Sequence, residues 1–431
     1  MASKRALLIS LIATLSATCS SVATDSVTTF TSAADAEVRA AIRVACSACD
    51  WEKAGSESVV LALTLDDRAP IHLPVTRSGT ADYEVLLGTV APGQHTVSIA
   101  PDPNLSATSL RDASAATFSI EIDQIPATSP AHQALSLAPF VYARPDTVGQ
   151  FTDVPLLMWY EVEPTPRGKR YRYSVIFSNE DGGTPADRLM ATWGRTTDIE
   201  YVYSVEVDTN GSILSEDMQG PKHEILPFQG RREGRHPLLW VSTENNMVLD
   251  HGTTTVRYAP APELADLTDV SRERVMDAND WIYAVMVKEL VREGKIVAGA
   301  PPGRGAIPDP RRYLFIEGCG EAGNNAIAVG VRVRGEWHSS DRGVPEYRIA
   351  RDGCYRAAIP LPANSDARDV EALRVQAFRR KEKVGDTPSR VTRLTMLFML
   401  DERFVPNPSA IHLWQGVAML HPGGPPFEIG R

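Results

Sequence analysis

Apolar and polar residues alternate in short stretches along most of the chain. Alternation with a period of two is typical of β-strands that bury one face. Between residues 37 and 125 six such stretches follow one another, separated by turn-forming residues. They cover residues 38–45, 58–65, 71–75, 83–87, 96–100 and 117–122. This pattern predicts an antiparallel sandwich of immunoglobulin type over residues 37–125.

The segments on either side of this sandwich differ in composition. Residues 24–36 are rich in Ser, Thr and Ala, which predicts a flexible leader. Residues 126–136 combine Pro with small residues and carry no period, which predicts a linker.

Alternation resumes after the linker and predicts a central β-sandwich over residues 137–258. Within residues 259–431, apolar residues recur at helical spacing over 268–294 and stop at Gly294, which predicts one long helix. A β-rich segment follows it and could pack with the central domain. We therefore predict a mainly β protein, with an immunoglobulin-like sandwich followed by a larger β-sandwich region with one long helix.

Composition narrows the class of protein. A chain of 431 residues exceeds the roughly 250–300 residues that one core supports, so several domains are expected. The net charge of −10, with no basic block to offset it, argues against nucleic acid as a partner. After the N-terminus no apolar run approaches the roughly 20 residues of a membrane span, so the mature chain is expected to lack one. The oligomeric state is left open.

The N-terminus has the three parts of an export signal. Lys4 and Arg5 precede an apolar stretch at 6–15, and small residues follow as far as Ala23. This predicts a signal peptide over residues 1–23 and a secreted or periplasmic protein. Lipid attachment at Cys19 is the alternative.

Four cysteines remain after removal of the signal peptide, namely Cys46, Cys49, Cys319 and Cys354. An even number in an exported chain predicts disulfides. Three pairings are possible, and the two local bonds would each lie within a single segment. Cys46 and Cys49 could instead form a redox motif. No long helix pattern follows them to stabilise a thiolate, so a structural bridge is favoured.

The common catalytic motifs are absent from the sequence. It has no nucleophile elbow, no zinc-binding His-Glu-x-x-His, no phosphate-binding Gly-Lys-Ser/Thr loop and no dinucleotide fingerprint. Serine and zinc hydrolase chemistry of the common kinds therefore has little support.

The densest polar patch runs over residues 177–184 and continues over 193–200. Asp198 and Glu200 stand two apart in a predicted strand, so both carboxylates are expected on one face, about 6–7 Å apart at the backbone. Such a pair suits a hard cation with oxygen ligands, or general acid–base work with one raised pKa. The alternative is a solvated strand face paired with Arg195 or Lys222. The opposite face is predicted to hold Ile199, Tyr201, Tyr203, Val205 and Val207.

A family resemblance adds to this interpretation. Five short sequence motifs occur in a characteristic order, at residues 138–146, 154–156, 197–200, 220–223 and 235–241. Thr197-Asp198-Ile199-Glu200 is the acidic one among them. This order resembles the vacuolar protein sorting-associated β-sandwich family, which shares an Asp-Trp-Glu element with necrosis-inducing-like secreted proteins. Ile199 stands where that element has Trp. In those proteins the acids bind a divalent cation in a polar cavity.

The patch and the resemblance together give a set of candidate residues. The resemblance implies a divalent cation, calcium or magnesium, as cofactor. The candidate metal ligands are Asp198, Glu200 and His223, and the candidate ligand-binding residues are Asp181, Trp193, Arg195 and His236.

Three functional hypotheses follow. The first is an exported protein of the cell envelope or extracellular space that binds a polar small molecule or glycan, or a lipid headgroup, through the cation. The second is a glycan or ester hydrolase that uses the same carboxylates as acid and base. The third is a structural scaffold.

Overall fold

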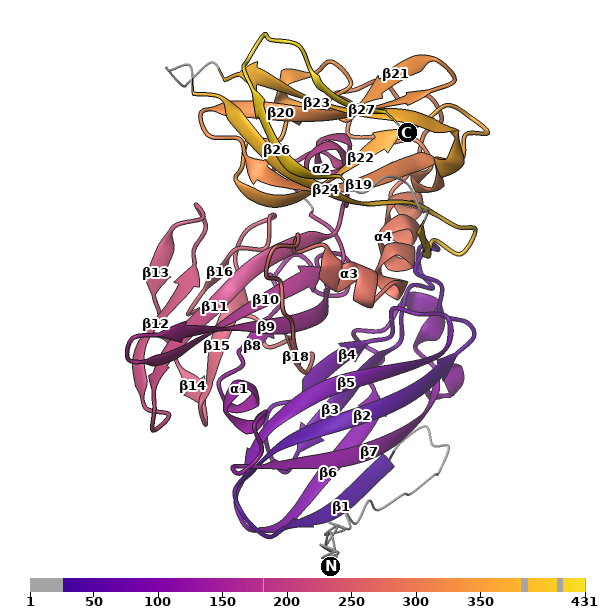
Figure 1. The fold of residues 1–431 in the computed structure, drawn as a ribbon. Coiled ribbons are helices and arrows are strands. Elements are labelled where there is room, and N and C mark those ends of the chain that lie inside the picture. Colours follow the sequence, from indigo (N-terminus) through magenta and orange to yellow (C-terminus); the bar gives the residue numbers. More distant parts are fainter. Residues whose placement is uncertain (1–25, 181, 381–386, 409–413, 431) are drawn as a thin grey trace, which may run out of the picture.

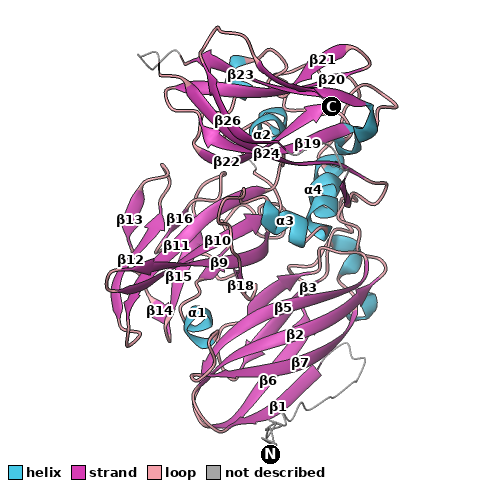
Figure 2. Cartoon of the chain, in the orientation of Figure 1, coloured by secondary structure: helices cyan, strands magenta, loops and turns pink. Residues whose placement is uncertain are grey.

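The computed structural model describes residues 26–180, 182–380, 387–408 and 414–430. Three β-sandwiches follow one another along the chain, and helices fill the space between the second and the third (Figure 1). Strands far outnumber helices among the described residues (Figure 2), so the prediction of a mainly β protein built from sandwiches is confirmed. The predicted signal peptide, residues 1–23, lies outside the described residues.

The first sandwich packs a four-stranded sheet, in the order β1-β6-β3-β4, on a three-stranded sheet, in the order β5-β2-β7. Its strands are β1 (Ser26–Ser32), β2 (Ala36–Cys46), β3 (Val60–Leu65), β4 (Ile71–Pro74), β5 (Gly79–Val90), β6 (Gly93–Pro101) and β7 (Thr117–Pro126). Short 3-10 helices at Thr108–Leu110 and Ala113–Ala115 lie between β6 and β7.

The expectation of a flexible leader over residues 24–36 is wrong for Ser26–Ser32, which form β1 and pair antiparallel with β6. Phe30 of this strand packs against the sandwich core. The composition misled because Thr, which is frequent here, is β-branched and favours extended structure although it is also common in polar loops.

The central sandwich begins with α1 (His132–Ser136), inside the segment expected to be a linker. Ala134 and Leu135 of α1 are buried, and the Tyr173 hydroxyl donates a hydrogen bond of 2.6 Å to the Ala134 carbonyl. Residues of the first and central sandwiches form one continuous hydrophobic core. The connection is therefore part of the packed structure rather than a free spacer.

Two sheets make up the central sandwich, in the orders β13-β12-β11-β10-β9-β18 and β14-β15-β8-β17, with β16 beside β15. The first sheet contains β9 (Pro155–Thr165), β10 (Gly168–Phe177), β11 (Asp198–Asp208), β12 (Ile213–Gln219), β13 (Ile225–Pro227) and β18 (Glu263–Leu264). The second contains β8 (Phe140–Tyr142), β14 (Arg232–Glu233), β15 (His236–Val241), β16 (Val248–Leu249) and β17 (Arg257–Tyr258).

The third sandwich has its own core and two sheets, in the orders β22-β19-β24-β25, with β26 beside β24, and β21-β20-β23-β27. Its strands are β19 (Tyr313–Glu321), β20 (Asn325–Val333), β21 (Glu336–Ser339), β22 (Gly353–Pro360), β23 (Val370–Arg379), β24 (Ser389–Leu400), β25 (Pro406–Pro408), β26 (Trp414–Leu420) and β27 (Phe427–Gly430). The 3-10 helices Pro310–Arg312, Pro345–Tyr347 and Ala367–Asp369 lie in its connections.

The single helix expected over residues 268–294 is two helices, α3 (Arg274–Ala278) and α4 (Trp281–Arg292). Asn279 separates them, with φ −121° and ψ 60°, outside the helical region. Its side chain donates to the Val275 carbonyl at 3.2 Å and to Glu263 Oε1 at 2.9 Å. Asn side chains compete in this way with helical backbone hydrogen bonds, which explains the break.

A further helix, α2 (Ala186–Trp193), was not predicted. It lies between β10 and β11 in the chain but packs against β22 of the third sandwich (Figure 1). Together with α3 and α4 it forms a second apolar core between the central and third sandwiches. This boundary positions the candidate site described below.

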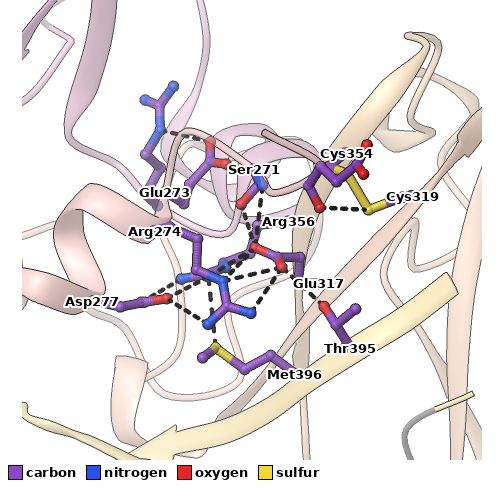
Figure 3. Close-up of polar contacts among 12 residues, drawn as sticks. Ser271, Glu273, Arg274, Asp277, Glu317, Cys319, Cys354, Arg356, Thr395 and Met396 are labelled. Atoms are coloured by element: carbon purple, nitrogen blue, oxygen red, sulfur yellow. Dashed lines mark hydrogen bonds and ion pairs between the residues drawn. A yellow bond between two sulfur atoms is a disulfide. The ribbon is translucent and has the colours of Figure 1, made fainter. Parts of the chain in front are cut away.

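A buried polar cluster also crosses this boundary (Figure 3). The Arg356 guanidinium lies 2.6 Å from Asp277 Oδ1 and 3.3 Å from Glu317 Oε2. Glu317 also accepts hydrogen bonds from the Ser271 hydroxyl at 2.7 Å and from Arg274 Nε at 3.1 Å. These contacts fix α3 to β19 and β22.

Two disulfides are present, Cys46–Cys49 and Cys319–Cys354, so the prediction of disulfides is confirmed and the structure decides among the three pairings left open. The second joins residues that face each other across β19 and β22. Disulfides are typical of proteins from oxidising compartments. Among the described residues, no helix has both the length and the apolar composition that crossing a membrane requires.

Candidate functional site

A polar cavity of about 480 Å³ opens where the central sandwich meets the third. Segments far apart in the sequence form its walls: the loop after β10, the end of α2, the start of β11, the turn after β12, the β15–β16 turn and the segment before α3. Its lining residues are Glu180, Gly183, Thr184, Leu189, Trp193, Arg195, Asp198, Glu200, Gln219, His223, Asn245 and Arg272.

The end of α2 brings Trp193 and Arg195 to the cavity. Gly194 ends the helix in the left-handed conformation, with φ 64°, and its amide donates to the Met190 carbonyl. A Cβ added to Gly194 would lie 2.6 Å from Arg356 Cγ, so the close approach of α2 to β22 also requires glycine.

Asp198 is 3% exposed and lies at the base of the cavity. Asn246 Nδ2 donates to Asp198 Oδ2 at 3.1 Å and also lies 3.2 Å from the Asn179 carbonyl oxygen. This amide therefore ties the first residue of β11 to the loop after β10. The carboxylate of Asp198 is fixed before any ligand arrives.

Three carboxyl groups of the cavity have raised pKa values. Burial and the negative charge of Asp198 raise the pKa of Glu180 to about 7. The same two causes hold the pKa of Glu200 well above its ordinary value. Burial also raises the pKa of Asp198, although Arg195 and the Asn246 hydrogen bond oppose this. Each of these groups therefore releases its proton at a higher pH than an exposed carboxyl group would.

Two arginines supply positive charge. Arg195 is buried, and its Nε donates to Glu273 Oε1 at 3.2 Å while its Nη1 donates to the Thr197 carbonyl. Burial tends to raise the pKa of Glu273, but Arg195 and neighbouring arginines hold it below its ordinary value. Arg272 is exposed and forms no ion pair within the described residues. One guanidinium is thus fixed in position and the other faces the solvent.

His223 lies at the open side of the cavity, in the turn after β12, with φ 59°. Its Nδ1 is 2.8 Å from Gln219 Nε2, and its Nε2 is 3.3 Å from Asn245 Nδ2. The side chain is exposed. It therefore links two turns at the rim and is accessible to a ligand.

The structure brings most of the candidate residues together. Trp193, Arg195, Asp198, Glu200 and His223 all line this cavity. Asp181 lies outside the described residues.

His236 does not belong to the site, contrary to the sequence-based expectation. It is 1% exposed, and its ring stacks on Phe140 with centroids 4.6 Å apart. Its Nδ1 lies 2.9 Å from the Ala138 carbonyl oxygen and its Nε2 lies 3.1 Å from Glu37 Oε2. Both ring nitrogens are thus committed to joining the first and central sandwiches.

Glu180 and Arg272 were not among the predicted site residues. Glu180 lies inside the polar patch noted in the sequence, so that patch was a usable signal. Arg272 comes from the segment predicted to begin a helix, more than 70 residues after Glu200 in the printed numbering. No local pattern indicates that it returns to β11.

The alternation predicted along β11 is interrupted. A register shift in the pairing of β10 with β11 leaves Val202 as an extra residue between Tyr201 and Tyr203. As a result Tyr201 and Ser204 line one cavity, whereas Tyr203, Val205 and Val207 lie in the core. The predicted face that grouped Tyr201 with Tyr203 is therefore wrong, because a β-bulge reverses the alternation.

The predicted metal site stays a prediction. Within the described ranges, no group of three or more His, Cys, Asp and Glu side chains has an arrangement that could hold a metal ion. Asp198 and Glu200 would have to lose the protons that their burial favours before they could bind calcium or magnesium.

Comparisons with known proteins do not assign the chain. No family model matches it, and no curated protein matches it. A crystal structure of a ruminal GH26 endo-beta-1,4-mannanase is similar at a TM-score of 0.19 and 12% identity, covering 32% of this chain and 27% of that one. A likeness at this level supports no statement about fold or function. The family resemblance of residues 137–258 stays a prediction.

The arrangement can bind a polar molecule from several directions. Protonated carboxyl groups donate hydrogen bonds, and charged arginines donate to oxygen atoms. The side-chain amides of Gln219 and Asn245 can donate as well as accept. The half-buried indole of Trp193 adds a flat apolar surface, and the Arg351 guanidinium lies 5.2 Å from its ring centroid. The chemistry suits a neutral or weakly charged ligand with many hydroxyl groups.

Proposed function

We propose that this chain is an exported protein that binds a polar ligand of glycan type in the cavity that its central sandwich forms with α2 and the segment before α3. The observation that carries the proposal is the convergence of Glu180, Asp198 and Glu200 with Arg195 in a cavity of about 480 Å³. Small-molecule sites have volumes of about 300–1,000 Å³. Groups with perturbed pKa values gather at functional sites more often than elsewhere.

The lining favours sugar hydroxyls over an apolar ligand. A hydroxyl group both donates and accepts, so it can satisfy a carboxyl group and a guanidinium at the same time. Trp193 is placed to contact the apolar face of a sugar ring.

Export is supported by two independent features. The N-terminal sequence has the pattern of a signal peptide. The four cysteines that follow it form two disulfides, which persist in oxidising compartments. Glycans are abundant ligands in those compartments.

The proposal is tested by calorimetric titration of the full mature chain with cellohexaose, chitohexaose and hexagalacturonate. We expect binding of at least one of the three, and a roughly tenfold loss of affinity in Glu200→Gln, corresponding to about 1.4 kcal/mol. Glu121→Gln, at an exposed position of β7, is the matched control. The proposal is contradicted if none of the three oligosaccharides binds, or if Glu200→Gln binds them as tightly as Glu121→Gln does.

A second function is favoured by one specific observation. The pKa of Glu180, raised to about 7, is suited to a general acid at neutral pH. The alternative is therefore a glycan hydrolase in which Glu180 protonates the leaving oxygen and Asp198 or Glu200 acts as its partner. New reducing ends after incubation with the same three oligosaccharides, lost in Glu180→Gln, would establish it. Turnover that survives this substitution would exclude the mechanism.

The predicted cation can be tested on the same protein. Calcium and magnesium chloride are titrated at pH 8, where Asp198 and Glu200 lose protons more readily. A metal role requires heat of binding that disappears in Asp198→Asn combined with Glu200→Gln. No heat for either ion removes the cation from the proposal and leaves direct binding of the ligand.

A further inference from the structure

A second polar cavity, of about 490 Å³, adjoins the first. It lies on the face of the sheet formed by β9, β10, β11 and β12. The segment before α3 forms its other wall. Arg272 lines both cavities. The other residues that matter here are Arg170 and Arg172 of β10, Tyr201 of β11, and Glu161 and Asp217 of the neighbouring strands.

The two cavities meet at the first half of β11. Glu200 lines the first cavity and Tyr201 lines the second. Successive side chains leave a strand on opposite faces, so the cavities lie on the two sides of this strand. β12 pairs with β11 only from Tyr203 onward, which leaves the preceding residues as an edge of the sheet. An elongated ligand can pass from one cavity to the other around this edge, next to Arg272.

The arginines of the second cavity are weakly engaged. Arg172 contacts Glu163 at 3.3 Å, and both side chains are close to half exposed, at 40% and 48%. Arg170 lies 3.4 Å from Glu206 Oε2, an oxygen that already accepts from Arg167 at 2.7 Å. Arg272 has no ion-pair partner among the residues that the structure describes. An exposed pair such as Arg172–Glu163 contributes at most about 1 kcal/mol, so an incoming anion can compete for Arg172.

The two carboxyl groups of this cavity are engaged with neutral donors. Asp217 accepts a hydrogen bond from the Tyr201 hydroxyl, and Glu161 accepts one from Trp159 Nε1 at 3.4 Å. Burial raises the pKa of Asp217, against the effect of Arg170 and Arg172. Among its lining residues the second cavity has three guanidinium groups and two carboxyl groups, whereas the first has two guanidinium groups and three carboxyl groups.

We propose that the second cavity is a subsite for an anionic group, and that the ligand of this protein is an acidic oligosaccharide that occupies both cavities. The inference rests on the proposed function and adds the charge and length of the ligand. The hydroxyl groups of one sugar unit bind among the carboxyl groups and arginines of the first cavity. A carboxylate-bearing unit further along the chain binds Arg172 and Arg272. Arginine suits this role because its planar guanidinium can bind a carboxylate through two parallel hydrogen bonds.

The test compares hexagalacturonate with the neutral cellohexaose and chitohexaose on the full mature chain, by calorimetry at low and at 0.15 M salt. We expect hexagalacturonate to bind at least tenfold more tightly than either neutral hexamer. Its advantage should shrink at the higher salt concentration, because salt screens exposed charges.

Two variants locate the effect. Arg172→Ala should lower the affinity for hexagalacturonate about tenfold and leave the neutral hexamers unchanged, since Arg172 lines only the second cavity. Arg272→Ala should lower the affinity for hexagalacturonate at least as much. Arg43→Ala, which removes an exposed arginine paired with Asp82 in the first sandwich, is the matched control.

The outcomes separate the inference from the proposed function. If a neutral hexamer binds as tightly as hexagalacturonate, or Arg172→Ala has no selective effect, the inference is overturned and the proposed function stands. If no hexamer binds to the unaltered chain, the proposed function fails and the inference fails with it. Circular dichroism of each variant identifies any loss of affinity that comes from unfolding.

Discussion

Two polar regions near the boundary of the central and third sandwiches, the ion-pair cluster around Arg356 and the first cavity, differ in the pKa values of their carboxyl groups. In the cluster of Figure 3, Glu317 faces the guanidinium groups of Arg356 and Arg274. Burial tends to raise the pKa of Glu317, but Arg356, Ser271 and Arg274 hold it below its ordinary value. In the cavity, Glu200 forms no ion pair with any described residue, and burial and Asp198 hold its pKa well above its ordinary value although Arg272 and Arg195 oppose this.

The difference shows which of the two regions is structural. The cluster is closed: each carboxylate is paired with an arginine and hydrogen-bonded, so it needs nothing from outside. The cavity keeps carboxyl groups incompletely satisfied, which costs stability and is a common property of binding and catalytic sites. The same residue types therefore form a structural ion-pair cluster in one place and a candidate binding site in the other.

The largest expected effect comes from opening the closed cluster. Arg356→Met removes a guanidinium partner from both Asp277 and Glu317 and leaves Arg274 as the remaining arginine beside these two carboxylates. We expect a loss of about 3–5 kcal/mol in unfolding free energy, measured by urea denaturation. Arg390→Ala, which breaks an exposed pair with Glu321, should cost no more than about 1 kcal/mol. Equal losses in the two variants would contradict the distinction drawn above.

A buried carboxyl group outside the cavity sharpens the comparison. Burial, with a contribution from Glu293, raises the pKa of Glu289 to about 7, although Arg292 opposes the rise and Trp51 Nε1 donates to it at 2.9 Å. A rise from 4.5 corresponds to about 3 kcal/mol of stability, present below pH 4.5 and lost as the pH rises through 7. Glu289→Gln should abolish most of this loss between pH 4.5 and 8.

Because Glu289 lines none of the cavities described above, its substitution should leave oligosaccharide binding unchanged. Unfolding midpoints across this pH range, measured beside ligand titrations, check both parts. A fall in affinity in Glu289→Gln would contradict this separation, because it would show that a buried carboxyl group outside both cavities affects ligand binding.

Isosteric substitutions in the two regions should have opposite signs. Glu317→Gln removes a charge that three neighbours stabilise, and we expect a loss of about 2–3 kcal/mol at pH 7. Its stabilising effect is present above the unfolded pKa of about 4.5 and is lost as the pH falls through the lowered folded pKa.

Glu200→Gln should instead stabilise the protein at pH 8 by roughly 1 kcal/mol or more, because each pKa unit of the rise corresponds to about 1.4 kcal/mol. The gain should disappear below pH 4.5, where the carboxyl group is protonated in both states. Destabilisation by both substitutions at pH 8 would show that the cavity carboxylates are compensated after all.

The smallest expected effect is on ligand affinity near neutral pH. Since the pKa of Glu180 is about 7, the affinity for a bound hexamer should change several-fold between pH 6 and pH 8. Glu180→Gln should flatten this dependence, and Glu371→Gln, at an exposed pair with Arg332, should preserve it. Calorimetric titrations at three pH values provide the measurement. An unchanged slope in Glu180→Gln would assign the titration to another group.

Part of the fold could be derived from local pattern because strands with one buried face record that burial in the sequence. The alternation at 117–122 and 171–177 falls in β7 and β10, and the two local cysteine pairs form the two disulfides. Errors arose where local pattern is ambiguous. The Thr-rich segment Ser26–Ser32 is a strand, and Asn279 interrupts a region of helical spacing.

The candidate site divides along the same line. Asp198, Glu200, Trp193 and Arg195 are close in the sequence, so a local patch pointed to them. Arg272 reaches the cavity only because α3 is fastened to the third sandwich through Asp277 and Arg356. His236, a candidate ligand-binding residue from the sequence, is buried against Glu37 of the first sandwich.

The sequence alone determined the β-rich class, the expectation of disulfides and a strand that begins with two acids, because these depend on residue counts, on neighbouring residues and on strand periodicity. Only the tertiary structure decided that these acids are buried, which cations face them, and that two cavities meet at Arg272. Burial and charge pairing depend on contacts between segments tens to hundreds of residues apart, and no local pattern records them.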